Sequence, residues 1–156
     1  MNHQQVQVLA TFVLLLGCRS VPKVAPGPAA NNTLATYIRL FNEGQFAQAL
    51  SFYDGDFHAE RVQIPRAPQD DVQLIAQACA ALLRRCDLRL RSVISTERVG
   101  VDSFLLTATF NDSLGRHFIA EPCCDSGVVV GESAWQFDVH KVGDGYRIGK
   151  LPLYFP

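Results

Sequence analysis

Apolar residues follow three patterns along the chain, and each pattern predicts a different kind of element. A nearly continuous apolar run covers residues 6–17. Residues 33–86 instead carry apolar side chains three and four positions apart, which is typical of amphipathic helices. After Cys86 apolar and polar residues alternate, as they do in half-buried strands. Helices followed by antiparallel strands predict an α+β domain.

Three helices are predicted in the first half of this domain. The first covers residues 33–43, TLATYIRLFNE, and Gly44 stands where a helix commonly ends in the left-handed conformation. The second covers residues 45–53 and leads into DGD, a turn signal. After a loop with two prolines, the third covers about residues 71–85, with acidic residues at its start and arginines at its end, as the helix dipole favours.

Four or five antiparallel strands are predicted after these helices. The first is long and is expected to contain a β-bulge. The sequence GDG at 143–145 predicts a hairpin turn between the last two strands. The expected strands cover residues 88–99, 104–110, 117–120, 134–141 and 146–150.

The apolar run at the start of the chain ends in Leu15-Leu16-Gly17-Cys18. A helix of about twelve residues rises only about 18 Å, so this run is too short to cross a bilayer but has the length of a secretory signal. The four residues resemble the lipobox of bacterial lipoproteins. That resemblance implies cleavage before Cys18 and attachment of acyl chains such as palmitate to it. Plain secretion and a retained anchor are the alternatives.

The resemblance to lipoproteins divides the chain into three parts. Residues 1–17 are expected to be the signal peptide, and residues 18–32 a lipidated cysteine with a proline-rich flexible tether. Residues 33–156 are expected to form one domain. Arg19 stands where the family's inner-membrane retention signal has an aspartate. The expected location is therefore the cell envelope, facing the periplasm, at the outer membrane where one exists.

Charge excludes one class of partner and leaves two others. Lysine and arginine total 14 against 15 aspartate and glutamate residues, a net charge of −1, so there is no electrostatic basis for nucleic-acid binding. The expected contacts are the membrane, through the N-terminal lipid, and either a small apolar ligand or another envelope protein. No cofactor is expected.

The order of elements resembles the nuclear transport factor 2-like superfamily. The sequences that carry this resemblance are LATYIRLFNEGQFAQALSFY near the start of the domain and WQFDVHKVGDGYRI near its end. The resemblance implies a curved antiparallel sheet wrapped around the helices as a cone with a pocket at its open end. The superfamily includes isomerases, dehydratases, hydrolases and non-catalytic binders, so it does not identify a reaction.

Four cysteines follow Cys18, and an even number in an oxidising compartment predicts disulfides. Cys79 and Cys86 would lie about 10 Å apart along one continuous helix, beyond the reach of a bridge. We therefore expect a bridge from this helix to the loop with Cys123 and Cys124. Buried thiols, or a metal or redox site, are the alternatives, but no CxxC motif is present.

Polar and aromatic residues offer a possible pocket but no recognisable catalytic motif. The segment DGDFHAE contains Asp56 and His58, which could line a pocket mouth together with His117 and Trp135. His140 is expected on a solvated strand face. No catalytic residue and no metal ligand is assigned. The expected function is a non-catalytic envelope lipoprotein, with an acid–base enzyme or a cysteine-based metal or redox protein as alternatives.

Overall fold

The computed structural model describes residues 28–81, 83–120 and 133–152. Four helices precede four strands, which confirms the α+β prediction. The helices are α1 (Pro28–Asn42), α2 (Phe46–Leu50), α3 (His58–Gln63) and α4 (Asp71–Ala80). The strands are β1 (Arg89–Arg98), β2 (Ser103–Asn111), β3 (Trp135–Val142) and β4 (Gly145–Ile148).

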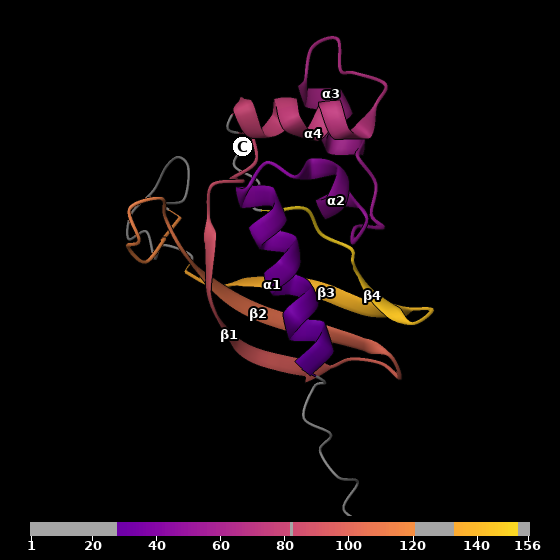
Figure 1. Ribbon diagram of the computed structural model, residues 1–156, viewed down its shortest axis with the longest axis vertical. Helices are drawn as coiled ribbons and strands as arrows, with labels where there is room; N and C mark the ends of the chain where they lie inside the picture. Colours follow the sequence, from indigo (N-terminus) through magenta and orange to yellow (C-terminus); the bar gives the residue numbers. More distant parts are fainter. Residues whose placement is uncertain (1–27, 82, 121–132, 153–156) are drawn as a thin grey trace, which may run out of the picture.

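The strands form one open antiparallel sheet in the order β1-β2-β3-β4, and α1 runs across it (Figure 1). In the centre of the sheet Phe104 lies opposite Val139 and Leu106 lies opposite Phe137. The register of β1 against β2 shifts twice, so the predicted irregularity in the first strand is confirmed. A sheet with this order leaves β1 and β4 as its edges, and residues 52–54 extend the β4 edge through hydrogen bonds to Ile148.

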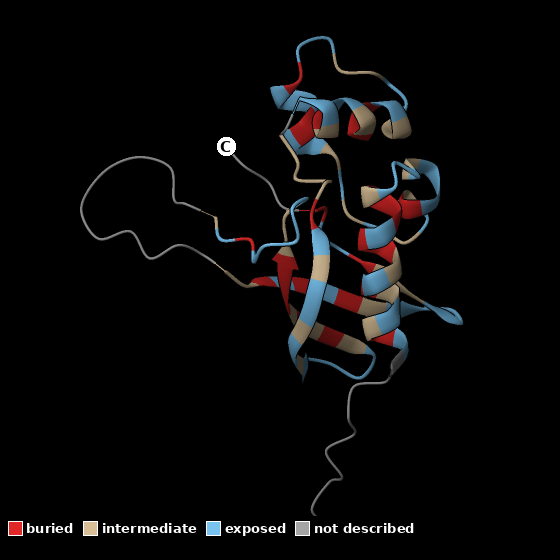
Figure 2. Ribbon diagram, turned by 60° about the vertical axis from the view of Figure 1, so that its left-hand side comes forward, coloured by how far each residue is buried: buried red, intermediate tan, exposed pale blue. Residues whose placement is uncertain are grey.

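The main core lies between α1 and the sheet (Figure 2). The apolar face predicted for the first helix is buried, because apolar residues spaced by three and four positions fall on one side of a helix. On β2 and β3 alternate residues point into the same core. The core residues contributed by these three elements include Leu34, Tyr37, Ile38, Phe41, Phe104, Leu106, Ala108, Phe110, Trp135, Phe137 and Val139.

A second, smaller core lies between α3 and α4 near the carboxyl end of α1 (Figure 1). Its buried members are Ile64, Leu74 and Ala78, with Leu83 packed against them. We call α3, α4 and the segment that continues to Cys86 the helical cap.

The structure corrects several predicted boundaries. α1 begins at Pro28, so residues 28–32 are helical rather than part of the tether; proline is well suited to the first position of a helix because its missing N–H has no intrahelical partner there. α3 forms in a segment expected to be a loop. The expected strand at 117–120 is represented by an isolated bridge between Asn111 and His117.

Three predicted features fall outside the described residues. They are the signal peptide, Cys18 with the first part of the tether, and the Cys123–Cys124 loop. Within the ranges that are described, no helix is long and apolar enough to cross a membrane.

Candidate functional site

A disulfide joins Cys79 to Cys86, with 5.6 Å between their Cα atoms. This corrects the expected pairing of the helix with the Cys123–Cys124 loop, at least for these two cysteines. The prediction assumed a helix continuing to Arg85, but α4 ends at Ala80 and the chain turns back. Closing so short a loop stabilises the folded chain by about 2 kcal/mol through the lost entropy of the unfolded chain.

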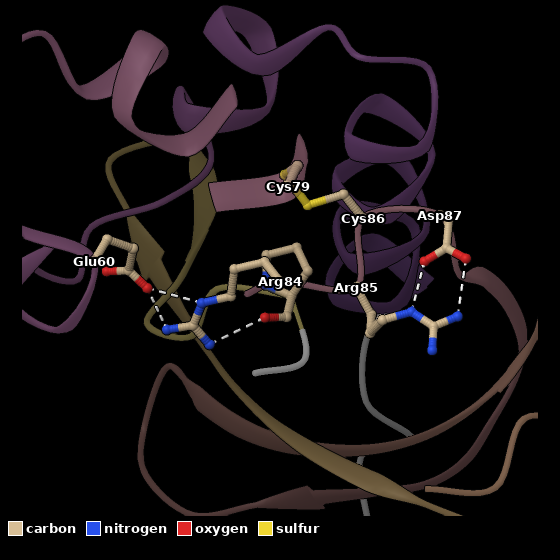
Figure 3. Close-up of a disulfide and its surroundings, with 7 residues drawn as sticks. Glu60, Cys79, Arg84, Arg85, Cys86 and Asp87 are labelled. Atoms are coloured by element: carbon tan, nitrogen blue, oxygen red, sulfur yellow. Dashed lines mark hydrogen bonds and ion pairs between the residues drawn. A yellow bond between two sulfur atoms is a disulfide. The ribbon is translucent and has the colours of Figure 1, made fainter. Parts of the chain in front are cut away.

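The two arginines between these cysteines extend in different directions (Figure 3). Arg84 donates from Nε to Oε1 of Glu60 over 2.8 Å, and its Nη2 contacts the same oxygen. Its Nη1 donates to the carbonyl oxygen of Pro152 over 3.2 Å. Glu60 is only 2% exposed. A carboxylate can be buried to this extent only with a positively charged partner, which Arg84 provides. Arg84 thereby joins α3 to the segment that follows β4.

Arg85 makes a bidentate ion pair with Asp87 over 2.8 and 2.9 Å. These hydrogen bonds lower the pKa of Asp87, although partial burial acts in the opposite direction. The Arg85 guanidinium also lies 4.8 Å from the ring centre of Phe118, which stacks on Trp135. The turn between the cysteines therefore contacts the sheet through Arg85 as it contacts the helices through Arg84.

A histidine and an aspartate meet at the β4 edge of the sheet. Nε2 of His140 lies 2.5 Å from Oδ2 of Asp54, and both side chains are about one-third exposed (35% each). His140 was expected to be solvated on the polar strand face, whereas it contacts a carboxylate from the segment after α2. A His–Asp pair of this kind can transfer protons to or from a group held against it.

The predicted pocket residues occupy different surroundings. The backbone N–H of His58 donates to Oδ1 of Asp56 over 3.0 Å, and both side chains are exposed at the start of α3. His117 is exposed and lines a hollow formed by Arg85, Asp112, Arg116, Phe118 and Ile119, which includes neither Asp56 nor His58. Trp135 is buried in the core. The four residues therefore do not line one common hollow of the described structure.

Hydrogen bonds order the loop that carries His117. Oδ1 of Asp112 accepts the backbone N–H groups of Leu114 and Arg116, and its Oδ2 accepts from the Arg116 guanidinium. Loss of water contact acts to raise the pKa of Asp112. The hydrogen bonds have the larger combined effect, so the pKa of Asp112 is lowered. The exposed His117 imidazole thus stands beside a loop whose charged groups already have partners.

One small cavity is found in the described part of the core. The enclosed cavity between the end of α1 and the sheet measures about 10 Å³, at the lower limit for holding one water molecule. A much larger groove of about 530 Å³ lies between α1 and β1. Its lining residues are Ala35, Ile38, Arg39, Asn42 and Glu43 from α1, and Arg89 and Leu90 from β1.

The groove is lined by apolar residues, one ion pair and a further arginine. Arg39 is paired with Glu43 over 2.6 Å. Asn42 donates to the carbonyl oxygen of Asp87 over 2.8 Å, which ties α1 to the segment that enters β1. Arg89 is exposed at the first position of β1. Sequence patterns gave no signal for this groove, because it depends on how far α1 lies from the edge strand.

Comparisons with known proteins add no family to this description. No protein-family model and no curated protein matches the chain. Within the described ranges no three histidine, cysteine, aspartate or glutamate side chains gather as a metal site would require. The fold and its contacts define an α+β domain in which an intrachain disulfide and a buried ion pair hold the helical cap together, and Arg84 joins the cap to the segment after β4.

Proposed function

We propose that this protein is a lipoprotein of the bacterial cell envelope whose α+β domain binds a small ligand without catalysing a reaction. Acyl chains on Cys18 would hold it at the membrane. The apolar run that ends in Leu-Leu-Gly-Cys supports this anchor. The Cys79–Cys86 disulfide supports it as well, because disulfides persist mainly in oxidising compartments outside the cytosol.

The observation that carries the ligand proposal is the groove between α1 and β1. Its volume falls within the range of about 300–1,000 Å³ that is typical of small-molecule sites. Ile38 and Leu90 line it with apolar surface, and Arg89 places positive charge at its rim beside the Arg39–Glu43 ion pair. A ligand with an apolar body and an anionic head, such as a fatty acid, matches this distribution of surface.

We also propose that the domain has the cone-like architecture of the nuclear transport factor 2-like superfamily. The packing of α1 across the sheet supports this assignment. In such a cone the interior is the usual place for a ligand. Because the enclosed cavity here is only about 10 Å³, we assign the ligand to the outer groove instead.

The alternative of an acid–base enzyme is supported by the contact between Asp54 and His140. The test is His140→Gln, which keeps the shape of a polar side chain but cannot carry a proton. A binding protein keeps its cellular function in this variant. A cysteine-based site is restricted by the disulfide, which already uses two of the four cysteines.

A photoreactive fatty acid added to membranes that contain the full chain tests the proposed function. We expect crosslinks in the peptides that contain α1 and the start of β1, on a chain whose Cys18 carries a lipid-sized mass increment. Ala35→Trp fills the groove from an exposed position and should reduce crosslinking severalfold. Ala47→Trp is the matched control, because Ala47 is exposed on α2 and lines another hollow. Equal crosslinking in both variants would contradict the assignment.

A further inference from the structure

We propose that the end of the sheet formed by the β1–β2 and β3–β4 turns rests on the lipid surface, with three valines in contact with the membrane. This inference rests on the lipid anchor of the proposed function. It adds an orientation, and it does not depend on the ligand groove.

Three of the seven large apolar side chains that are exposed among the described residues lie at this end. Val101 is 81% exposed, Val99 is 56% exposed and Val142 is 48% exposed. The first two belong to the turn between β1 and β2, and Val142 is the last residue of β3. The backbone N–H of Lys141 donates to the carbonyl oxygen of Asp102 over 2.9 Å, so the two turns are joined. Several exposed apolar side chains at one end of a domain offer a surface for contact with another apolar phase.

The chain enters the domain at the same end. Oγ1 of Thr96, near the end of β1, donates to Oδ1 of Asn31 in the first turn of α1 over 3.3 Å. Pro28 therefore lies at the end of the sheet that carries the three valines. From there α1 runs toward the helical cap, which lies at the far end of the molecule (Figure 1).

The length of chain between anchor and domain favours this orientation. Ten peptide units connect Cys18 to Pro28, and even fully extended they span at most about 35 Å. α1 rises about 21 Å from Pro28 to Asn42, so the helical cap lies about that far from the point where the tether joins the domain. The turn end is thus the part of the domain nearest to the point where the tether enters it, which favours its contact with the membrane.

The polar groups of this end are compatible with a lipid surface. Arg98 donates from Nε to the carbonyl oxygen of Gly100 over 2.9 Å and also contacts the carbonyl oxygen of Val101. These bonds satisfy turn carbonyls that would otherwise lose water on contact with lipid. Arg98 and Lys141 are balanced by Asp102 and Asp144, so apolar contact rather than net charge determines the orientation.

Tryptophan quenching by brominated lipid tests the orientation in the full, lipidated chain. The protein is reconstituted into vesicles of phosphatidylcholine that carries bromine on its acyl chains. Val101→Trp places a reporter among the valines, and Val62→Trp places the matched control on α3, where Val62 is 70% exposed. Trp135, which is 6% exposed, supplies a background that is measured in the unsubstituted chain. Val142→Trp is a second reporter if Val101→Trp does not fold.

We expect flotation of all chains with the vesicles, and severalfold stronger quenching of the indole introduced by Val101→Trp than of the one introduced by Val62→Trp. Failure of the unsubstituted chain to float would overturn the anchor and the orientation together. Flotation without quenching of the Val101→Trp reporter would overturn the orientation and leave the anchor standing. Equal quenching in the two variants would also overturn it. A blue shift of the reporter's emission that depends on protein density instead of bromine would identify a second copy as the occupant and would overturn the lipid contact.

Discussion

The core beneath α1 and the helical cap bury very different side chains. Beneath α1 the buried residues are aliphatic and aromatic, and Phe110 contacts both Trp135 and Phe137 through its ring. In the cap a small apolar cluster of three buried residues is combined with a buried carboxylate, its arginine and a disulfide.

The difference shows how a small unit can be fixed in place. A large apolar core is stabilised by the surface that it removes from water, in proportion to its area. The cap has too little apolar surface for that, so directional and covalent contacts hold it. Such contacts fail when one partner is lost, whereas an apolar core loses stability in proportion to the volume removed.

Truncation of the central core residue is expected to have the largest effect. Phe137 is completely buried, and Phe137→Ala should lower the free energy of unfolding by about 3–5 kcal/mol because it leaves a cavity beneath α1. Urea unfolding followed by circular dichroism measures this change. Ile94→Ala, at an exposed position of the same sheet, should remain within about 0.5 kcal/mol. Equal effects of the two substitutions would contradict the core described here.

Removal of one member of the buried ion pair should cost nearly as much. Glu60→Leu leaves the Arg84 guanidinium, whose side chain is 12% exposed, without its carboxylate, and should destabilise the chain by about 3 kcal/mol. The double variant Glu60→Leu with Arg84→Met should recover part of that loss, because neither charge is then buried.

The exposed pair next to it in the sequence is the control for this prediction. Arg61 and Asp71 are 36% and 47% exposed, and Asp71→Asn should cost less than about 1 kcal/mol. Both pairs are compared in the same urea titration. If the double variant is less stable than Glu60→Leu alone, desolvation of the charges is not the reason for the loss.

Loss of the disulfide should have a smaller effect than loss of the ion pair. Replacement of both Cys79 and Cys86 by alanine should lower the free energy of unfolding by about 2 kcal/mol, because only a short loop is closed. Reduction of the unsubstituted chain should give the same decrease. A non-reduced peptide map must show Cys79 linked to Cys86, and a link from either residue to Cys123 or Cys124 would contradict the structure.

The elements of the main core were easier to predict from the sequence than those of the helical cap. The buried faces of α1, β2 and β3 were predicted correctly. Apolar residues that recur every 3.6 or every 2 positions identify the buried face of a helix or strand without knowledge of its neighbours. α3 was missed for the opposite reason. Phe57, Glu60 and Ile64 share one helical face. A glutamate in the middle of that face indicates a solvated position in the sequence, and its burial depends on an arginine from a distant segment, Arg84.

The cysteine pairing was also mispredicted because a contact between distant residues determines where α4 ends. Residues 81–85 are good helix formers, so the sequence predicted that the helix would continue to Arg85. It ends at Ala80 because tertiary contacts compete with the helix: Leu83 packs in the cap and Arg84 reaches Glu60. The expected pairing of the cysteines was wrong for this reason. The groove likewise depends on the spacing of α1 and β1, which no local pattern encodes.

The smallest expected effect concerns Tyr37, which lies where the two regions meet. Its hydroxyl donates to the carbonyl oxygen of Lys150 over 3.1 Å, so Tyr37→Phe should cost about 1 kcal/mol at neutral pH. Burial, and then the charge of neighbouring Tyr53, raises the pKa of Tyr37 well above its usual value. Burial likewise raises the pKa of the more exposed Tyr53, to about 12.

These pKa values make stability fall on the alkaline side. Below pH of about 10 the folded and unfolded chains both hold the tyrosine protons. Above it the unfolded chain releases the proton of Tyr37 while the folded chain retains it, so stability decreases as the pH rises toward the folded pKa. Tyr37→Phe removes this contribution, and its stability should fall less steeply, by up to about 1.4 kcal/mol per pH unit. Tyr53→Phe should flatten the curve between about pH 10 and pH 12, the range over which only the folded chain keeps the Tyr53 proton. Parallel slopes for both variants and the unsubstituted chain would show that Tyr37 is not buried where the core meets the helical cap.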